Sequence, residues 1–126
     1  MNYIHIIALL ALLQYGFFGI MVGRARSKYG IHAPAISGNE HFERVFRVHT
    51  NTLEQLIIFL PALFIAGTYW SDAVIALIGL VYLCGRFIYW RTYTENPQKR
   101  AVGFLLTAIP NIILIIAGLT GIFFNS

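Results

Sequence analysis

The chain has 126 residues, of which 58% are hydrophobic and only 11% are charged, whereas a soluble domain carries about 25% charged residues. A chain of this length has room for one domain and cannot bury that much apolar surface in a core of its own, so we expect lipid to cover the excess. The net charge of +4 comes without the basic face and interleaved aromatic residues typical of nucleic-acid-binding proteins, and this argues against a nucleic-acid partner.

Four apolar runs follow one another along the chain. They cover residues 4–22, residues 55–71, residues 73–90 with Arg86 as the only charge, and residues 101–126. Each is close to the ~20 residues that a helix needs to cross a bilayer, and open strands would leave backbone groups without partners in lipid. The sequence therefore predicts an all-α membrane protein: a single four-transmembrane-helix up-down bundle over residues 1–126, with helices at about 3–23, 39–70, 72–94 and 99–124. We expect Arg86 to face protein or to extend its side chain to the membrane surface.

The basic residues indicate how the bundle is oriented. All nine Lys and Arg residues lie in or beside the first and third connections between the apolar runs. The positive-inside rule makes that side cytoplasmic and places both termini outside. A short chain without an added targeting tail suggests a bacterial inner membrane, with the endoplasmic reticulum as the alternative.

A polar ridge enters the second apolar run in the stretch "FERVFRVHTNTLE". Ser37 or Asn39 is expected to cap a helix that begins near residue 38. Steps of three and four residues then place one stripe on that helix, made of Glu40, Glu43, Arg44, Arg47, Asn51 and Glu54. We expect Glu40, Glu43 and Arg44 to form ordinary solvated ion pairs. Glu54, however, sits close to lipid depth, where an ionisable residue usually faces a cavity and marks function.

A second polar group ends the third run in the stretch "GRFIYWRTYTENPQKR". Arg86, Tyr89 and Tyr93 share one helical face, and Arg100 follows near the start of the fourth helix. Guanidinium groups suit carboxylates, a glutamate suits an ammonium group, and amide and phenol groups suit a peptide. Together the two groups predict a site for a small zwitterionic peptide, with a hydrophobic second substrate arriving from lipid. If the peptide carries a thiol, an arginine beside it would favour the nucleophilic thiolate.

The motifs "FERVFRVHTNTLE" and "GLVYLCGRFIYWRTY" resemble those of the MAPEG family, the membrane-associated proteins in eicosanoid and glutathione metabolism. The resemblance implies a homotrimer that binds glutathione between neighbouring subunits. It also implies that one subunit binds this co-substrate through Arg47, Asn51, Glu54, Tyr89, Tyr93 and Arg100, and that the neighbour contributes Arg26 and His49. Arg100 matches the arginine that holds the thiolate and is the expected catalytic residue. The implied activity is a membrane-bound glutathione S-transferase for detoxification, acting on a hydrophobic electrophile or a lipid hydroperoxide.

Three departures from the family limit this expectation. Gln55 stands where leukotriene-C synthases have a tyrosine, Ser27 where they have a second arginine, and Ala101 where prostaglandin E synthases have a serine. A general transferase, with or without glutathione-dependent peroxidase activity, therefore fits better than a leukotriene or prostaglandin enzyme. A non-catalytic membrane scaffold and a small four-helix transporter are the alternatives.

The cysteine and the histidines do not indicate a disulfide or a metal site. Cys84 is the one cysteine, so no intrachain disulfide is expected, and its apolar surroundings indicate a packing role. The histidine spacing matches no metal site, and none is expected.

Overall fold

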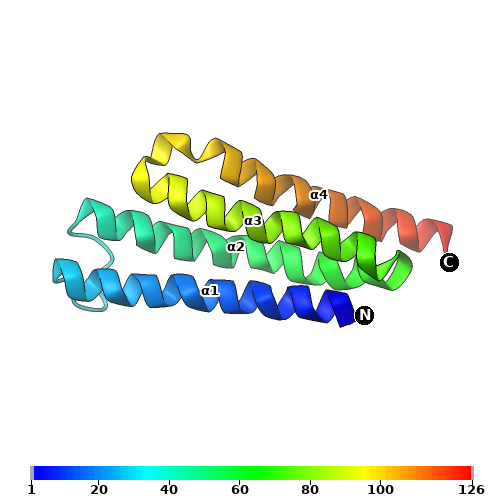
Figure 1. Ribbon diagram of the computed structural model, residues 1–126, viewed down its shortest axis with the longest axis horizontal. Coiled ribbons are helices and arrows are strands. Elements are labelled where there is room, and N and C mark those ends of the chain that lie inside the picture. Colours follow the sequence, from blue (N-terminus) through cyan, green and yellow to red (C-terminus); the bar gives the residue numbers. More distant parts are fainter. Residues whose placement is uncertain (1, 126) are drawn as a thin grey trace.

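The structure is a computed structural model that describes residues 2–125, and it is all-helical over that range. Its elements are α1 (Asn2–Tyr29), α2 (Glu40–Tyr69), α3 (Asp72–Glu95), the short 3-10 helix η1 (Pro97–Lys99) and α4 (Ala101–Phe124). Figure 1 shows the four long helices side by side, with the two chain ends at the same end of the bundle. The predicted fold class, a four-helix up-down bundle, is confirmed.

The helix boundaries follow from local chemistry. α1 continues to Tyr29 instead of ending near residue 23; Arg26 and Lys28 lie in its last turn, where cations favour the helix dipole. It stops at Gly30, whose φ of 68° is a left-handed conformation that glycine adopts freely. α2 begins after Asn39, whose side-chain oxygen accepts a hydrogen bond from the Phe42 N–H at 3.0 Å, so the expected cap is present.

All four long helices are long and apolar enough to cross a membrane. Their outward surfaces carry many large apolar side chains: Leu13 is 69% exposed and Ile57 is 68% exposed. In water such a surface would be an aggregation liability, whereas lipid covers it without cost. The bundle interior is built around pairs such as Phe59 and Tyr82, whose rings stack at a centroid distance of 3.8 Å and join α2 to α3.

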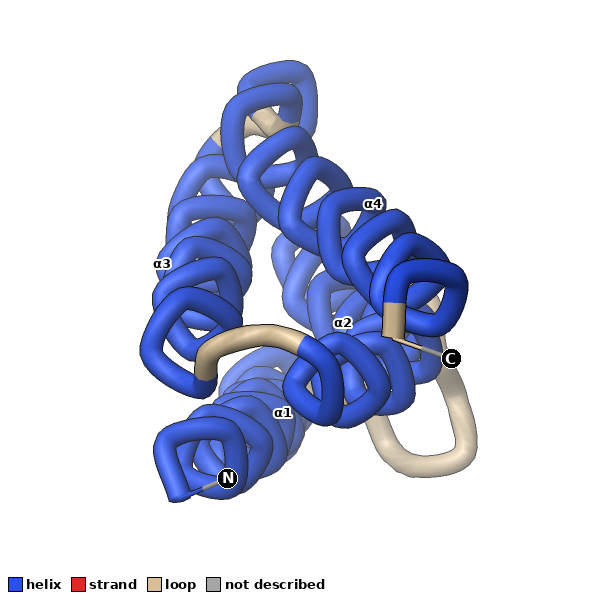
Figure 2. The backbone as a smooth tube through the Cα atoms, turned by 90° about the vertical axis from the view of Figure 1, so that its right-hand side faces the viewer, coloured by secondary structure: helices blue, strands red, loops and turns tan. Residues whose placement is uncertain are grey.

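Small residues set the close packing of α3 against α4. A Cβ atom added at Gly85 would lie 2.7 Å from the Leu106 backbone, and one added at Gly103 would lie 2.5 Å from the Cα of Tyr89. Glycine at these positions lets the two backbones approach, as is common between membrane helices. Figure 2 shows α1 and α4 on opposite sides of the bundle, with α2 and α3 between them.

Both longer connections between helices lie at one end of the bundle, opposite the chain termini (Figure 1). This end, which we call the basic end, holds the last turns of α1 and α3 and the first turns of α2 and α4. It carries Arg24, Arg26, Lys28, Arg44, Arg47, Arg91, Lys99 and Arg100. The predicted site residues must therefore be sought here.

Candidate functional site

A buried arginine organises the interior next to the basic end. Arg86 on α3 is 0% exposed. Its Nη2 donates to Asn51 Oδ1 at 2.8 Å and to Thr52 Oγ1 at 3.0 Å, while its Nη1 donates to Thr107 Oγ1 at 3.3 Å. The side chain therefore faces protein, and its hydrogen bonds link α2, α3 and α4.

The partners of Arg86 are suited to a buried cation. Both threonine hydroxyls donate to carbonyls of their own helices, Thr52 to Val48 O at 2.7 Å and Thr107 to Gly103 O at 2.9 Å. Their oxygens are thereby left to accept from the guanidinium. Within residues 2–125, no carboxylate lies within ion-pair distance of Arg86. Neutral acceptors thus offset part of the desolvation of this charge, and the buried Nε of Arg86 has no hydrogen-bond partner among the described residues.

This network fixes the orientation of Asn51. Its Oδ1 accepts from Arg86, so its Nδ2 points the other way and lies 3.4 Å from Glu54 Oε1. Glu54 in turn lies 3.9 Å from Nη2 of Arg47, and both side chains are more than half exposed. In this part of the predicted ridge, Arg47 and Glu54 are therefore exposed to a ligand, whereas Asn51 is buried beneath them with its amide directed toward Glu54.

The α3 residues of the predicted site lie beside this part of the ridge. Tyr89 and Tyr93 stack at a centroid distance of 5.3 Å, and the Arg86 guanidinium lies 4.4 Å from the Tyr89 ring centroid. The Tyr89 backbone lies against Gly103 near the start of α4, and Arg86 contacts both the Tyr89 ring and Asn51 of α2. The two sequence motifs thus converge at one place in the fold.

Arg100 stands at the N-terminus of α4. It is exposed and donates from Nη1 to Pro97 O at 3.1 Å. A hollow of about 530 Å³ lies against it, lined by Gln98, Arg100, Ala101 and Phe104. A guanidinium at the positive end of a helix dipole, beside an open hollow, is suited to an anion.

Two predicted site residues lie elsewhere in the chain. His49 is two residues before Asn51 on α2, which turns it about 200° around the helix, and it stacks on Tyr15 of α1 at 4.4 Å. Arg26 donates to Ala35 O at 2.7 Å and holds the connection between α1 and α2. A single chain therefore does not bring these two residues to the other six, and their contribution from a neighbouring chain stays a prediction.

The first residues of the ridge, Glu40, Glu43 and Arg44, stabilise the connections between helices. Arg44 pairs with Glu40 and donates to the carbonyls of Thr94 at 3.3 Å and Glu95 at 3.2 Å, which ties α2 to the end of α3. Glu43 accepts from the Gly38 N–H at 3.1 Å. These residues are more than the solvated pairs expected, because they secure the loops that frame the site.

Gln55 bonds to a neighbouring helix, whereas Cys84 lies on the exposed side of its own helix. Gln55 Oε1 accepts from Asn111 Nδ2 at 3.0 Å, so this side chain bonds to α4. Cys84 is exposed on α3, and the expectation of a packed thiol is wrong. The helical face that carries it points away from the core of the bundle.

Sequence reasoning missed Thr52 and Thr107 as partners of Arg86. Thr52 stands directly after Asn51, and Thr107 lies in an otherwise apolar run. A lone arginine in an apolar run needs polar partners in other runs. Threonines in the other apolar runs, at the same membrane depth as Arg86, could therefore have been predicted as its partners.

Fold and site together define a polytopic membrane protein with an arginine-rich polar site at one end of a four-helix bundle. The MAPEG family model matches residues 4–120, and the chain belongs to this family of integral membrane proteins. It is 45% identical over 117 residues to an uncharacterized protein of Synechocystis, covering 93% of this chain and 85% of that protein. It is 38% identical to human microsomal glutathione S-transferase 2, covering 92% and 79%. It is 37% identical over 94 residues to guinea-pig leukotriene C4 synthase, covering 75% of this chain and 63% of the synthase.

Proposed function

We propose that this protein is a membrane-bound glutathione transferase that joins the glutathione thiolate to hydrophobic electrophiles. The observation that carries the proposal is a polar group at the basic end, in which the exposed Arg47, Glu54 and Arg100 accompany the buried Asn51 and Tyr89. Such a group can hold a water-soluble peptide beside a substrate dissolved in the bilayer. Membership of the MAPEG family and similarity to a microsomal glutathione S-transferase support this reading.

Each part of glutathione has a matching group. Arg47 offers a guanidinium to a carboxylate, and Glu54 offers a carboxylate to the ammonium group. Asn51, held by Arg86, directs its Nδ2 toward the same surface and can donate to a peptide carbonyl. The stacked Tyr89 and Tyr93 contribute phenol hydroxyls. Because glutathione has charges of both signs, a surface with both signs recognises it better than a purely basic one.

Arg100 is the proposed catalytic residue. A free thiol has a pKa of about 8.5, and a neighbouring cation lowers that value. Arg100 would hold the thiolate at the α4 N-terminus, where the helix dipole adds to its effect. The thiolate then attacks the electrophile, a carbon–sulfur bond forms, and the leaving group departs with the electron pair of the bond that breaks. Holding both reactants together supplies a further part of the acceleration.

The same thiolate could serve a lipid hydroperoxide. Sulfur attack on the peroxide breaks the oxygen–oxygen bond and gives an alcohol and a sulfenic acid. A second glutathione then forms glutathione disulfide and releases water. This peroxidase activity needs no group beyond the thiolate site and is part of the proposal.

We further propose that the site is completed in a homotrimer, with Arg26 and His49 supplied by the neighbouring subunit. Their distance from the other six residues within one subunit supports this arrangement. We also place the basic end on the cytoplasmic side of a bacterial inner membrane, following the distribution of Lys and Arg. Labelling of Asn125→Cys in a Cys84→Ser background by an impermeant thiol reagent tests the outward position of the C-terminus.

The decisive experiment measures glutathione thiolate by its ultraviolet absorbance in detergent-purified protein near neutral pH. We expect a stoichiometric rise in wild type that Arg100→Ala loses, together with turnover. Lys99→Ala is the matched control, because it removes the adjacent exposed cation and should leave the rise intact. Retention of the oligomer by all three proteins makes the comparison valid. No rise and no glutathione binding by calorimetry would contradict the transferase and favour a scaffold or a transporter.

A further inference from the structure

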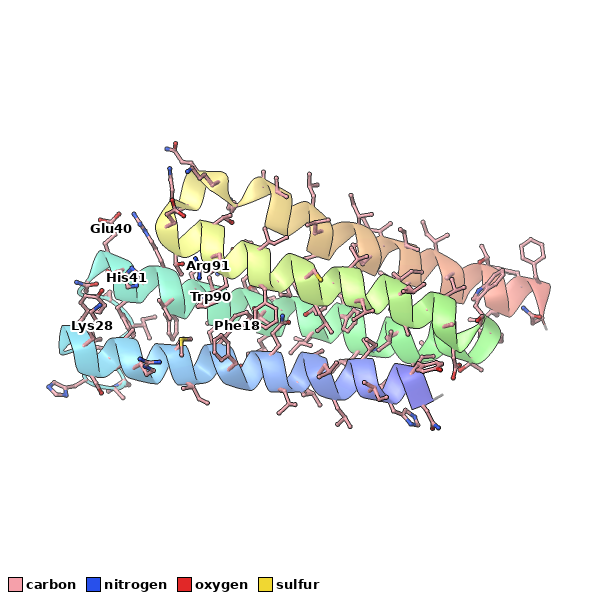
Figure 3. All side chains as sticks on the ribbon, in the orientation of Figure 1. Phe18, Lys28, Glu40, His41, Trp90 and Arg91 are labelled. Carbon is pink, nitrogen blue, oxygen red and sulfur yellow. The ribbon has the colours of Figure 1, made fainter. Side chains whose placement is uncertain are left out.

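A second cavity at the basic end lies outside the proposed glutathione site. It has a volume of about 800 Å³ and lies between the last turns of α1 and α3 and the first turns of α2. Met21, Val45 and Trp90 form part of its wall, and Arg24, Lys28 and Arg91 are its cations. Figure 3 shows Lys28, His41, Trp90 and Arg91 at this end of the bundle, contributed by three helices.

The charge of this cavity is unbalanced. Within residues 2–125, none of Arg24, Lys28 and Arg91 forms an ion pair. The one carboxylate that lines the cavity, Glu95, lies 3.9 Å from Nζ of Lys99 and is shared with that residue. Arg91 lies 5.8 Å from the Trp90 ring centroid, a contact that leaves its guanidinium able to bind an anion. The cavity therefore offers three cations to an anionic group.

A separate apolar groove lies between α1 and α3, next to this cavity. A hollow of about 350 Å³ lies further along these helices, lined by Leu10, Leu13, Gln14, Phe17, Leu83 and Phe87. The edge of Phe17 meets Trp90 at a centroid distance of 5.4 Å, and Phe87 lies 6.5 Å from Trp90. Neighbouring aromatic rings thus line the facing parts of the two hollows, Trp90 in the cavity and Phe17 and Phe87 in the groove.

The dimensions match a lipid chain. Arg24 follows Leu13 by eleven positions on one helix, which at about 1.5 Å per residue separates them by roughly 16 Å. Half of a hydrocarbon core ~30 Å thick is nearly the same length. A molecule with its charged group among the cations would therefore place its tail at the middle of the bilayer.

We propose that the groove between α1 and α3 binds an anionic phospholipid, with its phosphate among Arg24, Lys28 and Arg91 and one acyl chain along Phe17 and Phe87. Basic recesses between membrane helices attract anionic headgroups. The apolar groove favours a lipid over free phosphate. The site is independent of the proposed glutathione site, because none of the eight residues assigned there lines either hollow.

Trp90 allows a direct test. The chain has two tryptophans, Trp70 and Trp90, so Trp70→Phe leaves Trp90 as the only indole, at the basic end. The protein is placed in vesicles of phosphatidylcholine that contain brominated phosphatidylglycerol or, in parallel, brominated phosphatidylcholine. We expect the anionic lipid to quench Trp90 at a lower mole fraction than the zwitterionic lipid. Trp90→Phe, which leaves Trp70 at the opposite end, should show no headgroup preference.

Charge variants identify the cause of the preference. Each cation near a membrane surface contributes about 1 kcal/mol, so removing one should weaken the preference roughly fivefold. Arg24→Gln, Lys28→Gln and Arg91→Gln are made singly and together, and Arg24→Lys with Arg91→Lys is the charge-preserving control. The single variants decide the matter if the triple variant does not fold. Equal quenching by both lipids, or a preference that survives neutralisation, would overturn the proposal. Relief of quenching by inorganic phosphate would assign the cations to free phosphate and overturn it too.

Discussion

Replacement of Arg86 by leucine tests how the interior supports the candidate site. The change removes the donors to Asn51, Thr52 and Thr107. Both threonines keep the hydrogen bonds to their own helices, whereas Asn51 Oδ1 loses its partner, at a cost of about 1–3 kcal/mol. Removing a buried charge recovers desolvation energy that offsets much of this loss. We therefore expect the free energy of unfolding to change by no more than about 2 kcal/mol.

Glutathione binding should respond more strongly than stability. Without Arg86, the Asn51 amide is free to rotate, and Nδ2 is no longer directed toward the ligand surface. Loss of one hydrogen bond worth about 1.4 kcal/mol raises the dissociation constant roughly tenfold. Asn51→Ala should have a similar effect, and the double variant should lose little beyond either single one. Calorimetric titration with glutathione gives the three affinities, and thermal denaturation in the same detergent gives the stability.

Two milder variants serve as controls for this double-mutant cycle of Arg86→Leu and Asn51→Ala. Thr107→Val and Thr52→Val each remove one acceptor of Arg86 with little change in volume, and each leaves the Arg86–Asn51 hydrogen bond in place. We expect either one to weaken glutathione binding less than Arg86→Leu does. Additive losses from Arg86→Leu and Asn51→Ala would refute the reasoning, because residues that act through one hydrogen bond show coupling of about 0.5–3 kcal/mol.

Two further predictions concern helix packing and ligand charge. Gly103→Ala should lower stability by about 1–3 kcal/mol because its Cβ would meet the Tyr89 backbone. Gly16→Ala is the control and should not lower stability, since no atom lies within 4 Å of the new Cβ. Equal shifts in the thermal denaturation of the two variants would contradict the prediction. Glu54→Gln should weaken glutathione binding in calorimetry with little loss of stability, since its pair with Arg47 is exposed. Glu95→Gln, from an exposed pair of the same 3.9 Å length, should leave binding unchanged, and a similar loss in both variants would count against a specific role for Glu54.

Hydropathy was sufficient to predict the four-helix fold, because membrane helices satisfy their backbone locally and lipid leaves few alternatives. The end of α1 was harder to predict. Arg24, Arg26 and Lys28 look like a loop after an apolar run, yet the helix continues through them to Tyr29. Charged residues are good helix formers, so a change in hydropathy marks the membrane surface and does not by itself mark the end of a helix.

The site was predicted in its sequence pattern but not in its contacts. Periodicity places Arg86 and Tyr89 on one face of α3, and Asn51 and Glu54 on one face of α2. It does not determine how the two helices are rotated toward each other, and the Arg86–Asn51 hydrogen bond spans 35 positions in the sequence. The sequence pattern also did not determine how exposed Glu54 is, because the exposure of a side chain depends on the packing of all four helices.

Near its C-terminal end, α3 presents different faces to the two proposed ligands. Successive residues on a helix are turned by about 100°, so Tyr89 faces Arg86 and the glutathione surface while Trp90 lies in the groove against α1. Arg86 and Arg91 therefore serve different surfaces although they are close in sequence. Arg86 is buried among neutral acceptors and orients Asn51, whereas Arg91 is exposed to a cavity of unpaired cations. It follows that Arg91→Gln should alter lipid preference without altering glutathione affinity, and that Arg86→Leu should do the reverse.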